Sequence, residues 1–290
     1  MEWIIFALVA AFLFGFQTIL KKKVLKKQDT FEFLTLLYLI NFLILLPFIF
    51  SVNLFLSSYS LFLIFVRSVL MLVAIVSFTE ALKHLPISTV TPLSNLKPLF
   101  TLVLGFIILS ETIGPFQIVG VIVIIMGSYL LDSEGNLKDY KKPLKTLIES
   151  RQIHYILIFA VFYSLGAILS KTILKTIGPL DLLFYHSLFS VFLYFAIIFI
   201  FYSGVKDLKN SWNMAGFWII LIAILGVLAS YTSFLSFASI DSKVILIVPI
   251  LQVSNLISVV LGGKIFKEKH IGIKIIASIL MITGVVLILI

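Results

Sequence analysis

The sequence predicts an all-α, polytopic membrane protein with ten transmembrane helices in two inverted five-helix repeats, and three observations support this fold class. First, the 290 residues are 61% hydrophobic and only 12% charged, and the mean hydropathy is +1.20. A soluble domain is about 45–50% apolar and about 25% charged, so the composition excludes a soluble globular protein and a disordered chain. Second, apolar runs of about 20 residues, the length that crosses a bilayer, follow one another along the chain. Third, the two halves of the sequence repeat each other.

The first apolar run, Trp3–Leu20, is followed directly by Lys21, Lys22 and Lys23. A signal peptide carries its positive charge before the apolar run, so we predict a retained transmembrane helix here. The ten predicted spans are Trp3–Leu20, Phe33–Phe50, Ser60–Leu82, Ile87–Leu109, Pro115–Leu131, His154–Ile173, Leu182–Tyr202, Met214–Ile240, Val244–Phe266 and Ile271–Ile290.

The two halves match at nearly constant offsets. At an offset of 149 residues the matched pairs are Phe14 with Tyr163, Lys22 with Lys171, and Glu32 with Asp181; at 157 they are Pro92 with Pro249, Gly105 with Gly262, Glu111 with Glu268, and Gly127 with Gly284. The change in offset predicts a longer loop around Ser203–Asn213. Because each half has an odd number of spans, sequential copies must lie in opposite orientations, as in many secondary transporters. We therefore predict a first repeat over residues 1–131, a polar linker over 132–153 and a second repeat over 154–290.

The basic residues predict an orientation. Of the 22 Lys and Arg residues, 17 lie in loops on one side of the predicted spans and three on the other side. Cytoplasmic loops carry the excess of positive charge, so we predict a multi-pass protein of the cell membrane with both termini outside. These loops also account for the net charge of +9, and no nucleic-acid partner is expected.

Two spans contain proline together with amide side chains. Asn95 follows Pro92 by three residues, and Gln252 and Asn255 follow Pro249 by three and six. A proline inside a helix removes a backbone hydrogen bond and bends the helix, and a spacing of three keeps side chains on one face. Each repeat therefore presents a kinked, amide-bearing face, which either lines a cavity or forms a polar contact between helices.

Two cations lie within predicted spans, Lys97 near the centre of one and Arg67 in the preceding one. A charge inside the bilayer is costly and is usually functional. No Asp or Glu occurs near the middle of any predicted span, so a carboxylate-bearing or otherwise anionic ligand is one expected partner. The alternatives are a contact of Lys97 with carbonyls freed by proline and a reach of Arg67 to the headgroup region. The predicted substrate-binding residues are Lys97, Asn95, Gln252, Asn255, Arg67 and Gln17.

The other polar positions within spans are interpreted as packing contacts rather than ligand contacts; they are Tyr38, Asn41, Tyr163, His186 and Tyr231. Glu111 and Glu268 follow their spans and predict a helix cap or a loop salt bridge. The four His residues lie on separate segments and the chain has no Cys, so we expect no metal site and no other cofactor.

The segments Ser77–Leu131 and Ser236–Ile290 share an internal proline, a glycine near the end of the span, a Glu, and a last helix containing Gly. With the first-helix stretches Ala11–Lys22 and Ala160–Lys171, this pattern resembles the EamA-type branch of the drug/metabolite transporter superfamily. The resemblance implies a ten-helix carrier of small metabolites, often an exporter of amino acids or related solutes, that works by alternating access. Small multidrug relatives carry a proton-coupling carboxylate in the first helix, where this chain has Gln17.

The prediction is therefore a secondary transporter, not an enzyme, for a small polar metabolite that is amino-acid-like or anionic. The expected partners are a small-molecule solute and the lipid bilayer. The sequence leaves the coupling ion open and is compatible with a homodimer. The alternatives are a flippase for lipid-linked substrates and a membrane-embedded enzyme acting on lipid substrates.

Overall fold

A computed structural model describes residues 2–26, 28–112, 114–132, 151–202, 204–266 and 271–289. Every regular element in these ranges is helical. The elements are α1 (Glu2–Leu25), α2 (Thr30–Leu45), η1 (Leu46–Ser51), α3 (Ser58–His84), α4 (Ile87–Leu93), η2 (Ser94–Leu96), α5 (Lys97–Leu109), α6 (Pro115–Asp132), α8 (Arg151–Ile173), α9 (Pro179–Phe201), α10 (Val205–Ala238), α11 (Val244–Leu251), α12 (Val253–Ile257), η4 (Ser258–Gly262), α13 (Gly263–Ile265) and α14 (Ile271–Leu289).

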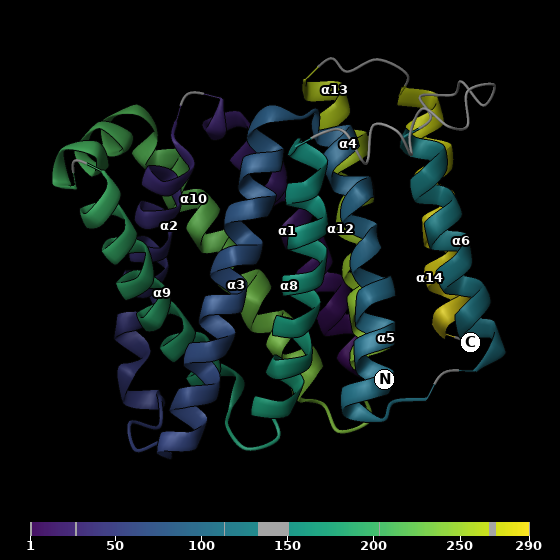
Figure 1. Cartoon of the computed structure of the whole chain (residues 1–290), viewed down its shortest axis with the longest axis horizontal. Helices are drawn as coiled ribbons and strands as arrows, with labels where there is room; N and C mark the ends of the chain where they lie inside the picture. The colour runs from purple at the N-terminus through teal and green to yellow at the C-terminus, as the bar shows by residue number, and fades with distance from the viewer. Residues whose placement is uncertain are drawn as a thin grey trace.

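The long helices stand side by side, with their connections at two opposite ends of the molecule. The α1–α2 and α3–α4 connections lie at the upper end in Figure 1, whereas the α2–α3, α8–α9 and α10–α11 connections lie at the lower end. Within the described ranges, seven helical stretches are long and apolar enough to cross a membrane, and two shorter apolar helices cover Ser94–Leu109 and Ile275–Gly284.

The outer surface of the helices is apolar. Large side chains such as Phe12, Phe62, Phe106 and Phe217 are exposed although they lie on long helices. A soluble monomer rarely exposes apolar surface on this scale, whereas a helix in lipid has its backbone groups satisfied internally and can present apolar side chains all round. The structure is therefore that of a multi-pass membrane protein.

Helices from the two halves of the chain interleave rather than forming separate bundles. Pairs in contact include α1 with α10, α3 with α8, α5 with α8, α2 with α9 and α10, α3 with α9, and α6 with α14. The last pair stands at one edge of the molecule in Figure 1. Gly120 and Gly127 on α6, like Ala277 and Gly284 on α14, are buried, because small residues let two helices approach closely in a membrane.

Two of the predicted spans are broken where proline and amide residues occur. The predicted span Ile87–Leu109 is divided into α4, the 3₁₀ turn η2 and α5, with Pro98 in the first turn of α5. The predicted span Val244–Phe266 is divided at Gln252, three residues after Pro249, and contains the π-helical turn η4. The predicted kinks are confirmed, and their cause is the hydrogen bond that proline removes.

One predicted loop is wrong. The segment Ser203–Asn213 was expected to be a loop, but α10 begins at Val205 and continues to Ala238. The backbone leaves helical geometry inside α10 only at Ala215, where φ is −150° and ψ is 17°. The extra residues of the second half therefore lengthen a helix and introduce a kink.

Two lysines at equivalent positions close the C-terminal ends of neighbouring helices. Lys22 Nζ donates to Leu82 O and Leu85 O at the end of α3. Lys171 Nζ donates to Phe237 O at 2.9 Å and Ser239 O at 2.8 Å at the end of α10. The last carbonyls of a helix lack intrahelical partners and carry partial negative charge, so each ammonium stabilises the end of the helix it caps.

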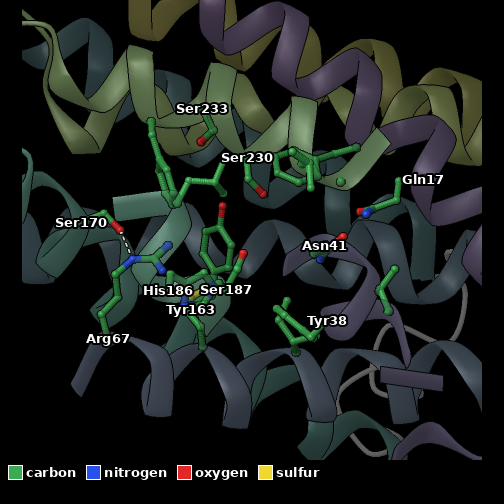
Figure 2. A pocket seen from close by; sticks show the side chains of 18 of the residues that line it. Gln17, Tyr38, Asn41, Arg67, Tyr163, Ser170, His186, Ser187, Ser230 and Ser233 are labelled. Atoms are coloured by element: carbon green, nitrogen blue, oxygen red, sulfur yellow. Dashed lines mark hydrogen bonds between the residues drawn. The ribbon is translucent and has the colours of Figure 1, made fainter. Parts of the chain in front are cut away.

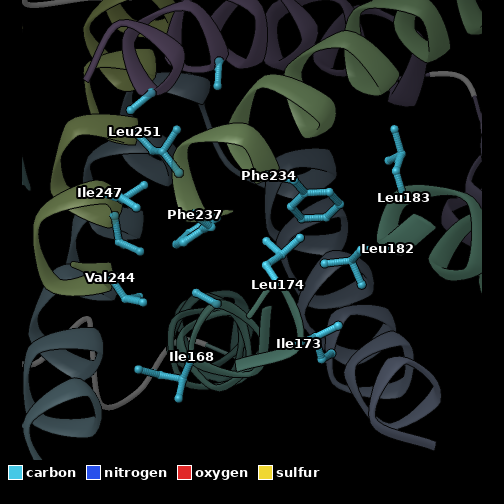
Figure 3. Packing of buried hydrophobic residues seen from close by; sticks show 14 of the residues in the cluster. Ile168, Ile173, Leu174, Leu182, Leu183, Phe234, Phe237, Val244, Ile247 and Leu251 are labelled. Carbon is cyan, nitrogen blue, oxygen red and sulfur yellow. The ribbon is translucent and has the colours of Figure 1, made fainter. Parts of the chain in front are cut away.

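The buried apolar side chains form two main clusters. In one, Leu182 and Leu174 pack with Phe234, Ile247 and Leu251 from α10 and α11 (Figure 3). The other joins residues from α1, α2, α3, α4, α8, α9 and α10 and includes Phe33, Leu82 and Tyr194.

Candidate functional site

A cavity of about 120 Å³ lies in the middle of the bundle. It is bounded by α1, α2 and α3 from the first half of the chain and by α8, α9 and α10 from the second half. Its polar lining, most of which is labelled in Figure 2, consists of Gln17, Lys21, Tyr38, Asn41, Arg67, Tyr163, Ser170, His186, Ser187, Ser230 and Ser233. A polar cavity of this volume has room for several water molecules or one small solute.

Arg67 is the cation most clearly placed in this cavity. It is only 4% exposed; its Nε donates to Ser170 Oγ at 2.6 Å, and its guanidinium carbon lies 4.8 Å from the centre of the Phe234 ring. Its Nη1 is buried without a hydrogen-bond partner among the described residues. A buried polar group without a partner is costly, so this nitrogen would gain from an acceptor that came within reach.

Gln17 lies on the opposite wall and is held by the backbone of α10. Its Nε2 donates to Ile222 O at 3.0 Å, and a Cβ added at Gly226 would collide with the same nitrogen. A side chain at position 226 would therefore displace the Gln17 amide from its present place against α10.

Polar groups from α2 and α9 complete the wall. Asn41 Oδ1 is buried and has no hydrogen-bond partner among the described residues, so it is a second polar atom without a partner, this time an acceptor. His186 Nδ1 lies 2.9 Å from Ser68 Oγ, and its ring meets that of Tyr38 edge-on at 6.1 Å. His186 and Tyr163 lie beside the Arg67 guanidinium in Figure 2.

Lys97 lies outside the cavity, behind Tyr163. Its Nζ is 4.3 Å from the centre of the Tyr163 ring and 4.7 Å from that of Phe159, and the side chain is buried. The faces of aromatic rings attract cations, and this attraction is stronger in a desolvated site. Lys97 therefore reaches the cavity only through Tyr163, which belongs to both the aromatic contact and the cavity wall.

Asn95, Gln252 and Asn255 are brought together, but at the contact between the broken helices and not among the residues that line the cavity. Asn255 Nδ2 donates to Asn95 Oδ1, and it also lies 3.1 Å from Gln252 Oε1 and 3.2 Å from Ser94 Oγ. Gln252 Nε2 is buried without a partner. We call these three residues the amide cluster; they join η2 to the junction of α11 and α12.

Glu111 forms the cap that the sequence predicted as one of two alternatives. Its two carboxylate oxygens accept from the backbone amides of Val244 and Ile245 at 3.0 and 3.2 Å, at the N-terminus of α11. A carboxylate at this position accepts from unpaired amides and complements the helix dipole. Its predicted counterpart, Glu268, lies outside the described residues.

Of the six predicted binding residues, Gln17 and Arg67 line the cavity. Sequence reasoning interpreted Tyr38, Asn41, Tyr163 and His186 as packing residues, yet all four line it as well. The repeat offset of 149 contains a signal for three of them, Tyr38, Tyr163 and His186. At that offset Phe14 matches Tyr163, Lys21 matches Ser170, Leu37 matches His186 and Tyr38 matches Ser187, and both members of each pair line the cavity.

The electrostatic character of the cavity is positive. Lys21 and Arg67 line it, and none of the described residues in its wall is Asp or Glu. Within the described ranges, no group of three or more His, Cys, Asp or Glu side chains is placed to hold a metal ion. The arrangement can therefore hold a small polar solute and neutralise negative charge on it.

Comparison with known proteins supplies the family and the fold. The EamA-like transporter family model matches residues 1–131 and 151–290. No curated protein shows a significant match to the chain. One matching solved structure, described as "Crystal structure of protein", is 14% identical, with a TM-score of 0.71 over 99% of this chain and 98% of that chain. At this identity, the likeness to the solved structure establishes a shared fold.

Proposed function

The chain belongs to the EamA-like transporter family, and on this premise we propose that it is a secondary transporter that carries a small polar metabolite, amino-acid-like or anionic, across the cell membrane. The family is a family of membrane transporters within the drug/metabolite transporter superfamily. The observation that carries the proposal is the polar cavity between α1, α2 and α3 on one side and α8, α9 and α10 on the other. Solute would occupy this cavity, and movement of the two halves would open it to each side in turn.

The proposed architecture is ten transmembrane helices in two inverted repeats, residues 1–131 and 154–290, joined by the linker 132–153. The packing pairs support it. In the two repeats α1 corresponds to α8, α2 to α9 and α3 to α10. The contact of α1 with α10 then corresponds to that of α8 with α3, and the contact of α2 with α10 to that of α9 with α3. The two lysine caps follow the same exchange, since Lys22 caps α3 and Lys171 caps α10. Inverted repeats of this kind place the solute site at their interface.

Within this architecture, Gln17 and Arg67 are the predicted residues that would contact solute directly in the described conformation. The amide cluster would serve as the contact across which the two broken helices move. Lys97 would act through Tyr163, whose ring it contacts at one edge of the cavity.

The test is uptake of labelled solutes by the purified protein in proteoliposomes, using a panel of amino acids and small carboxylates. We expect uptake of at least one member by the wild-type protein. We expect Gly226→Ala to lower that uptake by about tenfold, because the added methyl group displaces Gln17 and overpacks the wall of the cavity.

The matched control is Gly272→Ala, since a Cβ at Gly272 on α14 would meet no atom within 4 Å. It should transport like the wild type. Absence of uptake across the panel would contradict the proposed function. Wild-type uptake by Gly226→Ala would contradict the assignment of this cavity as the solute site.

A further inference from the structure

We propose that the cavity selects small carboxylate anions, with Arg67 as the carboxylate-binding residue, and rejects amino-acid zwitterions and amines. This inference rests on the proposed transport function and decides between the two solute classes that the proposed function leaves open. It follows from four properties of the cavity: its charge, the occupation of its aromatic rings, its open hydrogen-bonding positions and its size.

The charge of the wall favours an anion. Lys21 and Arg67 are 8% and 4% exposed, and the described wall contains no carboxylate. Electrostatic interactions are strong where water is excluded, so the carboxylate of a solute would be stabilised beside these cations. The ammonium group of a zwitterion would be desolvated near two cations without an anion to pair with, which is costly.

Three aromatic rings of the wall already make contacts with cations or rings of the protein itself. Aromatic cages bind ammonium groups through the faces of their rings. One face of Phe234 already contacts the Arg67 guanidinium, and one face of Tyr163 contacts Lys97 Nζ at 4.3 Å. Tyr38 is stacked on the ring of Tyr194 with 4.8 Å between centroids. One face of each of these three rings is thus already in contact with a cation or ring of the protein, which reduces the aromatic surface that an amine could use.

Two side chains of the wall carry a polar atom without a partner. Among the described residues, Arg67 Nη1 is a buried donor and Asn41 Oδ1 a buried acceptor, neither with a hydrogen-bond partner. A carboxylate accepts from the guanidinium in a charge-assisted bond, and a hydroxyl group on the solute can donate to the amide oxygen. The neutral amide oxygen can accept from an ammonium as well, but it leaves the positive charge of that group uncompensated.

The volume in this conformation suits a small solute. A cavity of about 150 Å³ accommodates benzene, which has six non-hydrogen atoms, and this one measures about 120 Å³. A carboxylate of about six non-hydrogen atoms is therefore a suitable probe.

Three probes of equal size separate the classes: lactate is an anion, alanine a zwitterion and lactamide neutral, and each has six non-hydrogen atoms. Binding is measured as the rise in melting temperature of the purified protein, since a ligand that binds the folded state stabilises it, and uptake is measured in proteoliposomes. We expect lactate to stabilise the protein and to be taken up, while alanine and lactamide at the same concentration produce no rise.

Variants test whether Arg67 is responsible. Arg67→Met should weaken lactate binding by about tenfold or more. Arg67→Lys keeps the charge and protects against a folding defect, and it should retain the preference for lactate with reduced affinity, because an ammonium lacks the planar fork of donors. The control is Lys23→Met, which removes an exposed cation that stacks on Trp218 outside the cavity; it should bind lactate like the wild type.

The outcomes distinguish this inference from the function on which it rests. Uptake of alanine without lactate binding would contradict the proposed anion preference but would agree with the proposed transport function. Stabilisation by lactate that depends on Arg67, without uptake of any solute, would support the proposed anion site and contradict the proposed transport function. Equal binding of lactate by Arg67→Met and the wild type would show that Arg67 does not bind the carboxylate.

Discussion

Arg67 and Lys97 are both buried cations that lie over aromatic rings, but only Arg67 reaches the cavity. Arg67 is fixed by Ser170 on one side and Phe234 on the other, and one of its nitrogens is left unpartnered. Lys97 contacts the rings of Tyr163 and Phe159. The two side chains therefore have different physical roles, since one can touch a solute and the other positions a ring that can touch it.

We predict that Lys97→Ala lowers solute uptake by tenfold or more, because Tyr163 loses the buried cation that orients its ring, a contact worth about 2 kcal/mol when desolvated. The measurement is initial uptake into proteoliposomes containing equal amounts of folded protein. Lys97→Arg retains a cation over the rings and should recover most of the rate. Wild-type rates in the alanine variant would refute a role of Lys97 in transport.

At the scale of elements, the broken helices and the lysine caps determine how the bundle is held. Proline interrupts α4–η2–α5 and α11–α12, and the amide cluster joins the two breaks. Ser164 Oγ on α8 donates to Lys97 O at 3.1 Å beside the first break, so α8 is hydrogen-bonded to the backbone at this point. The sequence identified the proline kinks, whereas the partner across each break comes from a distant part of the chain.

We predict that Lys171→Met lowers the free energy of unfolding by about 2 kcal/mol, because the charge-assisted bonds from Lys171 to the end of α10 are lost. The measurement is thermal melting of the purified protein in detergent. Lys175→Met is the matched control, since Lys175 lies one turn further along and is exposed; its melting temperature should not change. Equal melting of both variants would show that the cap does not stabilise α10.

At the scale of the whole molecule, the cavity lies where the two halves of the chain meet. Its wall takes residues from both of the main apolar clusters, such as Leu183 from one and Leu37 from the other. A tight apolar core leaves few voids larger than a water molecule. The polar residues along this boundary interrupt that packing and create the space in which a solute could bind.

Orientation is a property of the whole molecule and follows from the distribution of charge. Since 17 of the 22 basic residues belong to loops on one side of the predicted spans, we predict that this side is cytoplasmic and that both termini are outside. A C-terminal fusion to a fluorescent protein that matures only in the cytoplasm should be dark, while a reporter in the 132–153 linker should be active. Bright C-terminal fluorescence would contradict this prediction and place the C-terminus in the cytoplasm.

Much of the fold could be predicted from the sequence because a bilayer imposes simple rules. Helices in lipid must be long and apolar, so α1, α3 and α14 begin and end within a few residues of the predicted spans. The start of α10 at Val205 could not be predicted in this way, because the segment before Asn213 contains charged residues, which are typical of a loop outside the lipid. Local polarity identifies where a chain leaves the lipid but not whether it stays helical there.

The candidate site was predictable only in part. Arg67 and Gln17 stand out because an apolar span makes a polar residue conspicuous. Asn95 and Lys97 stand out equally, yet the turn at η2 directs one toward α12 and the other toward α8. Two residues of one short segment thus have different neighbours, and sequence spacing does not reveal which of the two adjoins a cavity.

The sequence by itself determined that this chain crosses a membrane, that it carries the pattern of a transporter family and that cations without carboxylates lie within its spans. These properties follow from the composition and from the order of residues along the chain. They can be predicted because burying polar groups in lipid is costly. Only the tertiary structure decided where the cavity lies and which polar residues share it. That assignment depends on how α1, α2 and α3 pack against α8, α9 and α10. A contact between residues more than one hundred positions apart cannot be predicted from the sequence of either segment alone.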